Sequence, residues 1–198
     1  MISIVIIVRN DSVRQFIGQA LESHADYKVT GIYESTEEFL RESMTSPSPQ
    51  VILLDNSLQA NALRALRNLK RRLPTSEVVL FTFADKSEDI YNAFCAGASG
   101  YILQSEDVED MIRSIQDIMS GDMIVLPSIA QKILHSHTSA NAHNLTKGEV
   151  QLMLAIANGQ SMPYIRDTLK VPAQKIRSQI KSIFSKLHIS TQTTTASN

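Results

Sequence analysis

The sequence contains no tryptophan, a single cysteine and no long apolar run. One cysteine, Cys95, excludes an internal disulfide framework and a zinc site built from cysteines, which is usual for proteins of a reducing compartment. No apolar run approaches the roughly 20 residues that cross a bilayer, and the start MISIVIIVRND lacks the basic region of a signal peptide. These absences predict a cytoplasmic protein without a membrane partner.

The motifs of common enzyme classes are also missing. The sequence has no phosphate-cradling glycine loop, no cluster of metal ligands, and no nucleophile with a matching base. We therefore expect that the protein is not an enzyme, that it has no catalytic residue and that it holds no catalytic metal.

Charge is divided unevenly along the chain. Residues 1–144 carry 12 basic and 18 acidic side chains, and residues 145–198 carry 7 and 2, so the two parts have net charges of −6 and +5. A basic segment attached to an acidic one favours nucleic acid as a partner of the C-terminal part.

Short apolar runs alternate with segments of helical period over the first 125 residues. The predicted strands are 2–8, 27–33, 50–54, 78–82 and 100–103. Strands that are apolar on both faces and separated by helices predict an α/β fold, in which helices cover both faces of a parallel sheet. The helix after the first strand should bury an apolar stripe that consists of Val13, Phe16, Ile17, Ala20 and Leu21.

The pattern changes after Gly121, where the fifth of these helices should end. We predict a first domain over residues 1–121, a linker with a short helix over 122–144, and a helical domain over 145–198. In this last domain Thr146 and Glu149 form a capping box.

Two helices joined by a tight turn follow in the helical domain. A short helix over 162–169, a turn at 170–172 and a longer helix through Leu187 predict a helix-turn-helix. The inward positions of the longer helix are Ile176, Ile180, Ile183 and Leu187. The outward positions are Lys175, Arg177, Ser178, Lys181 and Ser182.

The segment VILLDNS ends the third predicted strand at Asp55. In a doubly wound sheet of order 2-1-3-4-5 the chain reverses between strands 1 and 3, and ligands bind at the carboxyl ends of those strands. Val8, Arg9 and Asn10 end the first strand and should therefore face Asp55.

Four segments together resemble one known family. They are VILLDNS, VVLFTFAD, AGASGYILQ and the segment from Leu145 to Ser190. The chain resembles, to about residue 190, response regulators of the NarL/FixJ type, which join a receiver domain to a LuxR-type helix-turn-helix. The resemblance implies a flavodoxin-like receiver with a five-stranded sheet of order 2-1-3-4-5, followed by a small all-α domain. It further implies double-stranded DNA as a partner, a homodimer, and a histidine kinase or another protein as a possible partner.

The resemblance also implies roles for residues at the strand ends. Receivers of this family accept a phosphoryl group on an aspartate after strand 3, with a magnesium ion held by an acidic pair after strand 1. Asp55 matches the acceptor, whereas the acidic pair falls on Val8 and Arg9. The other pocket positions are Thr82 for the hydroxyl residue, Phe83 for a small residue, Tyr101 for an aromatic switch and Gln104 for a lysine.

These replacements predict that the metal site is lost. Magnesium requires hard oxygen ligands, and the three positions Val8, Arg9 and Asp55 sum to a charge of 0 instead of −3. At an effective dielectric near 20, each unit charge a few ångströms away contributes about 3 to 4 kcal/mol. We therefore expect no cofactor, with magnesium only if the receiver is active.

We hypothesise that Arg9 pairs with Asp55. The alternative is that Arg9 points to solvent and Asp55 caps a turn, and Asp11 is expected to cap the first helix.

The basic end should bind DNA through its second helix. The resemblance places Lys175, Arg177, Ser178 and Lys181 at the contacting positions.

The leading interpretation is a DNA-binding transcriptional regulator whose atypical receiver works independently of phosphorylation. One alternative is a conventional response regulator that a histidine kinase phosphorylates on Asp55, and another is a partner-binding module without DNA binding. Because the chain ends in the polar STQTTTASN, we expect dimer contacts from the receiver, at its first or fifth helix.

Overall fold

A computed structural model describes residues 1–42, 47–55, 59–82, 87–103, 107–120, 125–138 and 144–195. Five parallel strands form one sheet in the order β2-β1-β3-β4-β5. The strands are β1 (Ile2–Ile7), β2 (Tyr27–Tyr33), β3 (Val51–Asp55), β4 (Glu77–Thr82) and β5 (Gly100–Leu103). The predicted fold class and strand order are therefore confirmed, and β2 and β5 have the predicted bounds.

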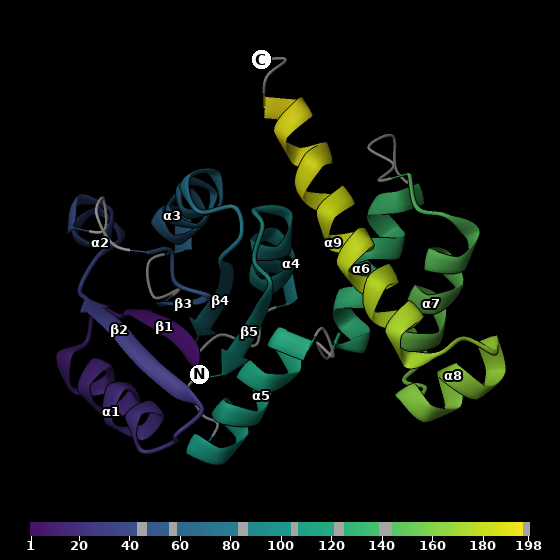
Figure 1. Cartoon of the computed structure of the whole chain (residues 1–198). Helices are drawn as coiled ribbons and strands as arrows, with labels where there is room; N and C mark the ends of the chain where they lie inside the picture. The colour runs from purple at the N-terminus through teal and green to yellow at the C-terminus, as the bar shows by residue number, and fades with distance from the viewer. Residues whose placement is uncertain are drawn as a thin grey trace. The chain divides into compact units, whose positions relative to one another are not determined.

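Helices connect the strands along the chain. They are α1 (Asp11–Glu22), α2 (Thr36–Glu42), α3 (Gln59–Arg72), α4 (Ser87–Cys95) and α5 (Val108–Ser120). Figure 1 shows α1 and α5 on one face of the sheet and α2 and α3 on the other. This covering on both faces explains why Val51, Ile52 and Leu53, three consecutive residues of β3, are all fully buried.

The chain forms two compact units. The sheet unit consists of residues 1–85 and 96–116, and the helical unit of residues 86–95 and 117–198. The helical unit contains α4 together with α6 (Pro127–Thr138), α7 (Lys147–Ala157), α8 (Met162–Leu169) and α9 (Ala173–Thr195). The domain bounds expected from the sequence, 1–121, 122–144 and 145–198, remain predictions.

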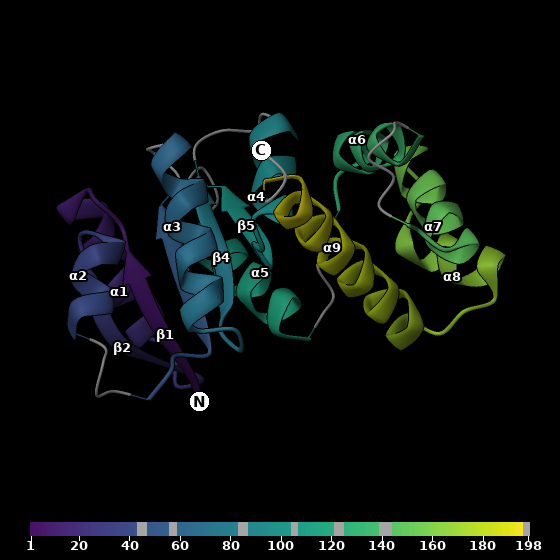
Figure 2. The same ribbon diagram turned by 90° about the horizontal axis from the view of Figure 1, so that it is seen from above.

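The helical unit has an apolar core of its own. Figure 2 shows α6 beside α7, and Ile129, Ala130 and Ile133 of α6 are fully buried. The predicted inward residues of α9 are also buried, with Ile183 and Leu187 completely inaccessible. The rings of Phe94 in α4 and Phe184 in α9 stack with their centroids 4.0 Å apart. Burial of these side chains is the main stabilising contribution to this unit.

The helix ends follow the residues at each boundary. Gly159 takes a positive φ of 71° directly after the C-cap of α7, as expected for a helix that ends at glycine. Lys170 takes a positive φ of 52° at the end of α8, before the turn that leads to α9. The prediction that the longer helix ends near Leu187 is wrong, because α9 continues to Thr195. No glycine or proline lies between these two residues to stop it.

One residue of the predicted apolar stripe in α1 does not face the core. Phe16 is 60% exposed, whereas its neighbours Ile17 and Leu21 are buried. Ile17 and Leu21 are four residues apart and face the sheet together, while Phe16 is turned about 100° away from Ile17 around the helix axis.

Among the described residues, no helix is both long enough and apolar enough to span a membrane.

Candidate functional site

Three of the predicted pocket residues lie at one edge of the sheet. Asp55 ends β3, Thr82 ends β4, and Val8 directly follows β1. The strands are in register there, with Ile7 paired to Leu54 and Asp55 paired to Phe81. Asp55 is half-buried and Thr82 is buried. The ends of β3 and β4 therefore bring the Asp55 carboxylate and the Thr82 hydroxyl group to the same end of the sheet.

Tyr101 lies further along the same sheet, in β5. It pairs with Leu80 of β4 and is half-buried. Phe83 and Gln104 lie outside the described residues.

Val8 is part of the apolar core rather than of a polar pocket. Its side chain is 1% exposed. Its backbone N–H donates to the Tyr33 carbonyl at 3.1 Å, and its carbonyl accepts from Arg14 Nη1 at 2.6 Å. Both backbone groups of Val8 are therefore paired, and its side chain offers no ligand atom.

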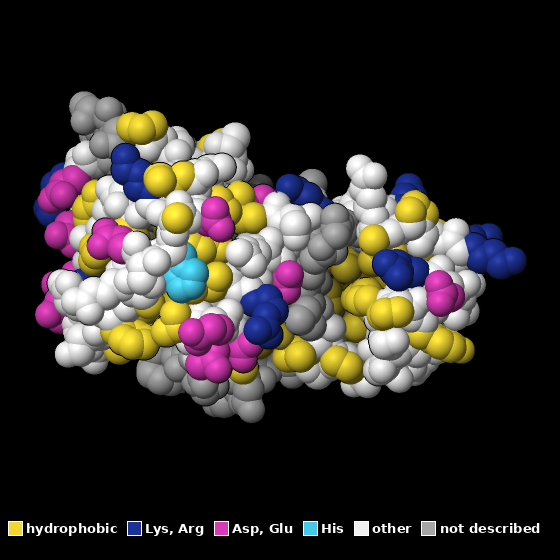
Figure 3. Space-filling model, turned by 60° about the horizontal axis from the view of Figure 1, so that its bottom comes forward, with side chains coloured by type: hydrophobic (Ala, Val, Ile, Leu, Met, Phe, Trp, Pro, Cys, Tyr) yellow, Lys and Arg dark blue, Asp and Glu magenta, His cyan; other side chains and the backbone are white. Residues whose placement is uncertain are grey.

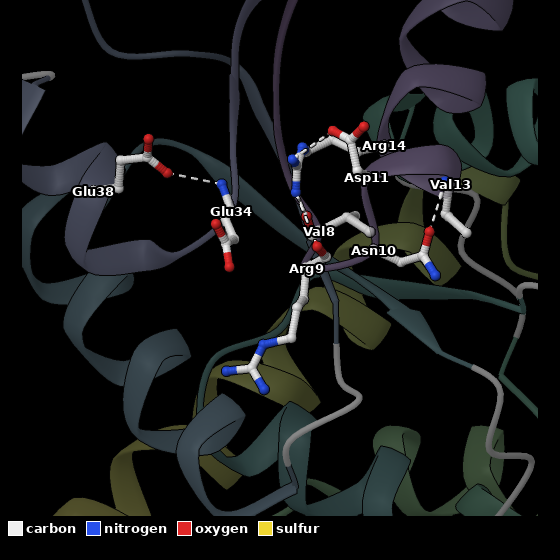
Figure 4. Close-up of polar contacts among 8 residues, drawn as sticks. All are labelled: Val8, Arg9, Asn10, Asp11, Val13, Arg14, Glu34 and Glu38. Atoms are coloured by element: carbon white, nitrogen blue, oxygen red, sulfur yellow. Dashed lines mark hydrogen bonds and ion pairs between the residues drawn. The ribbon is translucent and has the colours of Figure 1, made fainter.

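Arg14 fixes the loop between β1 and α1 (Figure 4). Besides the bond to Val8, its Nη1 donates to the Arg9 carbonyl at 3.0 Å, and its Nη2 lies 2.7 Å from Asp11 Oδ1. The Arg14 side chain is only 14% exposed. Because hydrogen bonds from a charged donor are stronger than neutral ones, this guanidinium holds the loop in one conformation. Sequence reasoning missed this role, although an Asp and an Arg three residues apart at a helix start indicate such a pair.

Asn10, and not Asp11, caps α1. Asn10 Oδ1 accepts a hydrogen bond from Val13 N at 3.1 Å, and its backbone is extended with φ −71° and ψ 117°. Asp11 is already the first helical residue, and its carboxylate is bound to Arg14. The prediction that Asp11 is the cap is therefore wrong, because the helix begins at Asp11 itself, one residue earlier than that role requires.

Arg9 does not form the predicted ion pair with Asp55. Its side chain is exposed and points away from the pair formed by Arg14 and Asp11 (Figure 4). In the part of the chain that the structure describes, no ion pair joins Arg9 to Asp55. The hypothesis of that pair is wrong, and the alternative that Arg9 points to solvent is confirmed. That Asp55 caps a turn stays a prediction.

The outward face of α9 carries the predicted DNA-contacting residues. Lys175, Ser178 and Lys181 are all exposed, and the Ser178 hydroxyl donates to the Lys175 carbonyl at 2.8 Å. The side chain of Arg177 lies outside the described residues. Ser182 was expected to face outward but is half-buried, because its hydroxyl donates to Glu149 Oε1 at 2.7 Å.

Glu149 lies at the centre of a polar network that joins α7 to α9. The predicted capping box is present, with Thr146 N 2.6 Å from Glu149 Oε2 and Glu149 N 3.3 Å from Thr146 Oγ1. Lys186 Nζ lies 2.6 Å from the same carboxylate and donates to the Asn144 carbonyl at 3.2 Å. The Glu149 side chain is 4% exposed. This buried carboxylate therefore accepts hydrogen bonds from three residues, Thr146, Ser182 and Lys186.

The network changes the acidity of Glu149. Burial alone would raise the pKa of this carboxyl group, since it disfavours the charged form. The hydrogen bonds from Lys186, Thr146 and Ser182 outweigh burial and lower the pKa from 4.5 to about 2. Glu149 therefore stays ionised, and its hydrogen bonds to Ser182 and Lys186 hold the start of α7 against α9.

Both units show charged side chains on the face drawn in Figure 3. Most of the acidic side chains (magenta) lie on the sheet unit, which also shows Lys and Arg (dark blue), and the helical unit shows mainly Lys and Arg. Among the described residues, no three His, Cys, Asp or Glu side chains come together as a metal site.

Comparison with known proteins identifies the family. A model of the response regulator receiver domain matches residues 4–116, which is more than half of the chain. The chain therefore belongs to the response regulators, and its resemblance to the NarL/FixJ type is confirmed by relatives of the LuxR family.

The similarity extends beyond the receiver. The transcriptional regulatory protein LiaR of Bacillus subtilis is 27% identical over 99% of this chain and 95% of its own. The RcsB response regulator of Salmonella typhimurium has the same fold, with a TM-score of 0.57, 17% identity, and coverage of 94% of this chain and 91% of its own. RcsB has also been solved as a complex with DNA. A LuxR-family two-component response regulator from Aurantimonas sp. SI85-9A1 gives a TM-score of 0.58 at 25% identity, over 69% of this chain and 98% of its own.

Proposed function

We propose that this response regulator is a DNA-binding transcriptional regulator whose receiver works without phosphorylation of Asp55. The observation that carries this proposal is the conformation of the loop after β1. The Val8 side chain is buried there, and the Asp11 carboxylate is bound to Arg14. Val8 and Asp11 therefore supply no oxygen ligand beside Asp55.

The residues at this edge do not fit the magnesium ion that receivers of this family use. Such an ion requires several oxygen ligands, and the matching positions hold an isopropyl group and a guanidinium group. Phosphoryl transfer is catalysed largely by electrostatic stabilisation, to which the metal ion contributes. Asp55 without these ligands is better suited to a structural role at the end of β3.

The basic face of α9 supports the DNA-binding part of the proposal. Lys175, Ser178 and Lys181 are exposed on a helix whose opposite side packs into an apolar core. Residues 145–198 carry a net charge of +5, which attracts the phosphate backbone. The LiaR relative is a transcriptional regulator, and RcsB forms a complex with DNA.

Labelling with acetyl phosphate and magnesium tests the receiver. We expect little or no phosphorylated protein on a phosphate-affinity gel, and no difference between the natural chain and Asp55→Asn. Arg9→Asp restores one acidic position and should bind magnesium more tightly than the natural chain. If the natural protein labels stoichiometrically on Asp55, it is a conventional response regulator, and this part of the proposal is wrong.

Salt titration of duplex binding tests the DNA contact. Loss of one phosphate contact by Lys181→Gln should reduce the slope of log Kobs against log[salt] by about 0.9. Lys28→Gln removes an exposed lysine from β2 and serves as the control, with an unchanged slope. A natural protein that binds no duplex of any sequence would instead be a partner-binding module.

A further inference from the structure

Helix α3 carries a concentration of positive charge that the proposed function does not use. Its sequence QANALRALRNLKRR contains five basic residues and no acidic one. Without them, the rest of residues 1–144 carries 7 basic and 18 acidic side chains. A strongly basic helix therefore stands within an otherwise acidic part of the chain.

Three of these residues form a stripe along the helix. Arg64, Arg67 and Arg71 are exposed and are spaced by three and four residues, which places them on one side of α3. The stripe extends over about 10 Å, because seven residues of an α-helix rise by 1.5 Å each. Arg72 is exposed next to it. The other side of α3 is apolar, with Leu66 and Leu69 fully buried.

Interactions within the chain do not account for this stripe. Arg71 donates to Asn68 Oδ1 at 2.9 Å, and within the described ranges no carboxylate forms an ion pair with Arg64, Arg67, Arg71 or Arg72. The stripe also contains like-charged pairs at i, i+3 and i, i+4, which destabilise an isolated helix. Because these arginines do not stabilise α3, we look for their role in a partner outside the sheet unit.

The helix dipole explains only part of the charge. Basic residues in the last turn of a helix interact favourably with its carbonyl groups. Lys70 shows this directly, because its Nζ donates to the carbonyls of Pro74 and Ser76 at 3.4 and 2.8 Å. Arg64 and Arg67 lie before that turn, where the dipole has little effect.

The chemistry of the stripe favours nucleic acid over a protein or a lipid surface. Protein interfaces have an apolar centre, and helices that bind membranes expose an apolar face. Among the described residues, the exposed large hydrophobic side chains are Met1, Phe16, Ile32, Leu154 and Tyr164, and none belongs to α3. Arginine is also suited to phosphate, which its planar group can bind through two hydrogen bonds.

We propose that Arg64, Arg67 and Arg71 form a second contact with the phosphate backbone of duplex DNA. A duplex carries one negative charge per about 1.7 Å of its axis, so a stripe of this length can lie opposite several phosphates. The contact reads no sequence and adds affinity that depends strongly on salt. This inference rests on the proposed function, because it assigns a second surface to the same partner.

The test compares two triple variants of the full chain that have equal net charge. Arg64→Gln/Arg67→Gln/Arg71→Gln removes the stripe, and Lys28→Gln/Arg41→Gln/Arg113→Gln removes three exposed basic residues from β2, α2 and α5. Binding of each protein to a labelled duplex of mixed sequence is measured by fluorescence anisotropy over a range of KCl concentrations.

The stripe variant should reduce the slope of log Kobs against log[salt] by about 2.7, which is 0.9 for each of three contacts. Between 50 and 200 mM salt its affinity should then fall about 40-fold less than that of the natural chain. The control variant should keep the natural slope. Circular dichroism should show equal helix content for all three proteins, since the substituted side chains are exposed.

Three results have different meanings. If the stripe variant keeps the natural slope while Lys181→Gln lowers it, the second contact is wrong and the proposed function stands. If the stripe variant changes the mass measured by light scattering and not the slope, the partner is a second copy of the chain, which also overturns this proposal. If the natural chain binds no duplex, the proposed function itself fails.

Discussion

Asp55 and Glu149 are two carboxylates that differ in burial and in surroundings. Glu149 is buried and accepts hydrogen bonds from Thr146, Ser182 and Lys186. Asp55 is half-buried at the end of β3, beside positions that hold Val8 and Arg9 in place of two acidic residues. Glu149 is part of a buried network on which the helical unit depends, whereas under the proposed function the sheet unit keeps its fold without the ligands of a metal site.

The reason lies in what each region requires for folding. A charged group in the core must be fully paired, so the loss of one partner of Glu149 would destabilise the whole unit. The sheet is held by buried apolar strands such as Val51–Leu53, which need no contribution from the residues at the strand ends. Residues at the strand ends can therefore be substituted without loss of the fold.

Lys186→Met should have the largest effect, because it leaves a buried carboxylate without its cation. We expect the helical unit to lose about 3 to 5 kcal/mol of stability. Amide hydrogen exchange in α7 measures this loss. The control is Lys147→Met, which changes an exposed lysine of α7 and should alter the exchange of that helix little. Unchanged protection in Lys186→Met would show that the network is not a stabilising one.

Acid should weaken the helical unit through the same carboxylate. The pKa of Glu149 is about 2 in the folded chain and 4.5 ordinarily, so its contribution is complete above about pH 4.5 and disappears as the pH falls towards 2. The difference corresponds to about 3 kcal/mol. Hydrogen exchange of α7 at several pH values measures it, and Glu149→Gln should lack this part of the pH dependence. An identical profile in both proteins would contradict the assignment.

Arg14→Met tests the loop after β1 and should have a smaller effect. It removes two hydrogen bonds to backbone carbonyls from a group that is 14% exposed, which should cost the sheet unit about 1 to 3 kcal/mol. Arg113→Met is a matched control, because Arg113 forms the same i, i+3 pair with Asp110 on the surface. That pair should contribute less than about 1 kcal/mol. Hydrogen exchange in β1 distinguishes the two variants, and equal effects would mean that the carbonyl bonds contribute nothing.

Asp55→Asn should have the smallest effect of all. If the receiver works without phosphorylation, the affinity for duplex DNA should change by less than about two-fold, or about 0.4 kcal/mol. The measurement is the same anisotropy titration, made after incubation with acetyl phosphate and magnesium. A larger loss than this, seen only after that incubation, would indicate a working phosphoacceptor.

The fold could be predicted from the sequence because its signals are repeated along the chain. β2 and β5 begin and end at the predicted residues, and the short helix over 162–169 does too. Burial alternates along β2 and β5, and the short helix ends at Lys170, which takes the left-handed conformation. The capping box of Thr146 and Glu149 was equally evident, because both residues are close together in the sequence.

The errors concern contacts that local pattern does not determine. The pair between Arg9 and Asp55 was inferred from facing strand ends, but the direction of a long exposed side chain depends on its surroundings. Arg14 fixes the adjacent carbonyls instead. Lys186 and Ser182 lie 37 and 33 residues from Glu149, so no spacing rule could assign them to the network. Phe16 has the right period for the core and is nonetheless exposed.

The position of α4 has a consequence for dividing the protein into fragments. Residues 86–95 lie between β4 and β5 in the chain but belong to the helical unit, where Phe94 stacks on Phe184. The chain therefore passes between the units three times, and the helical unit is discontinuous in sequence. A fragment of residues 117–198 would expose the ring of Phe184 to water, and a receiver fragment that ends at residue 116 would do the same to Phe94. Any single cut between residues 95 and 183 therefore separates the two stacked rings and leaves one of them uncovered on each product.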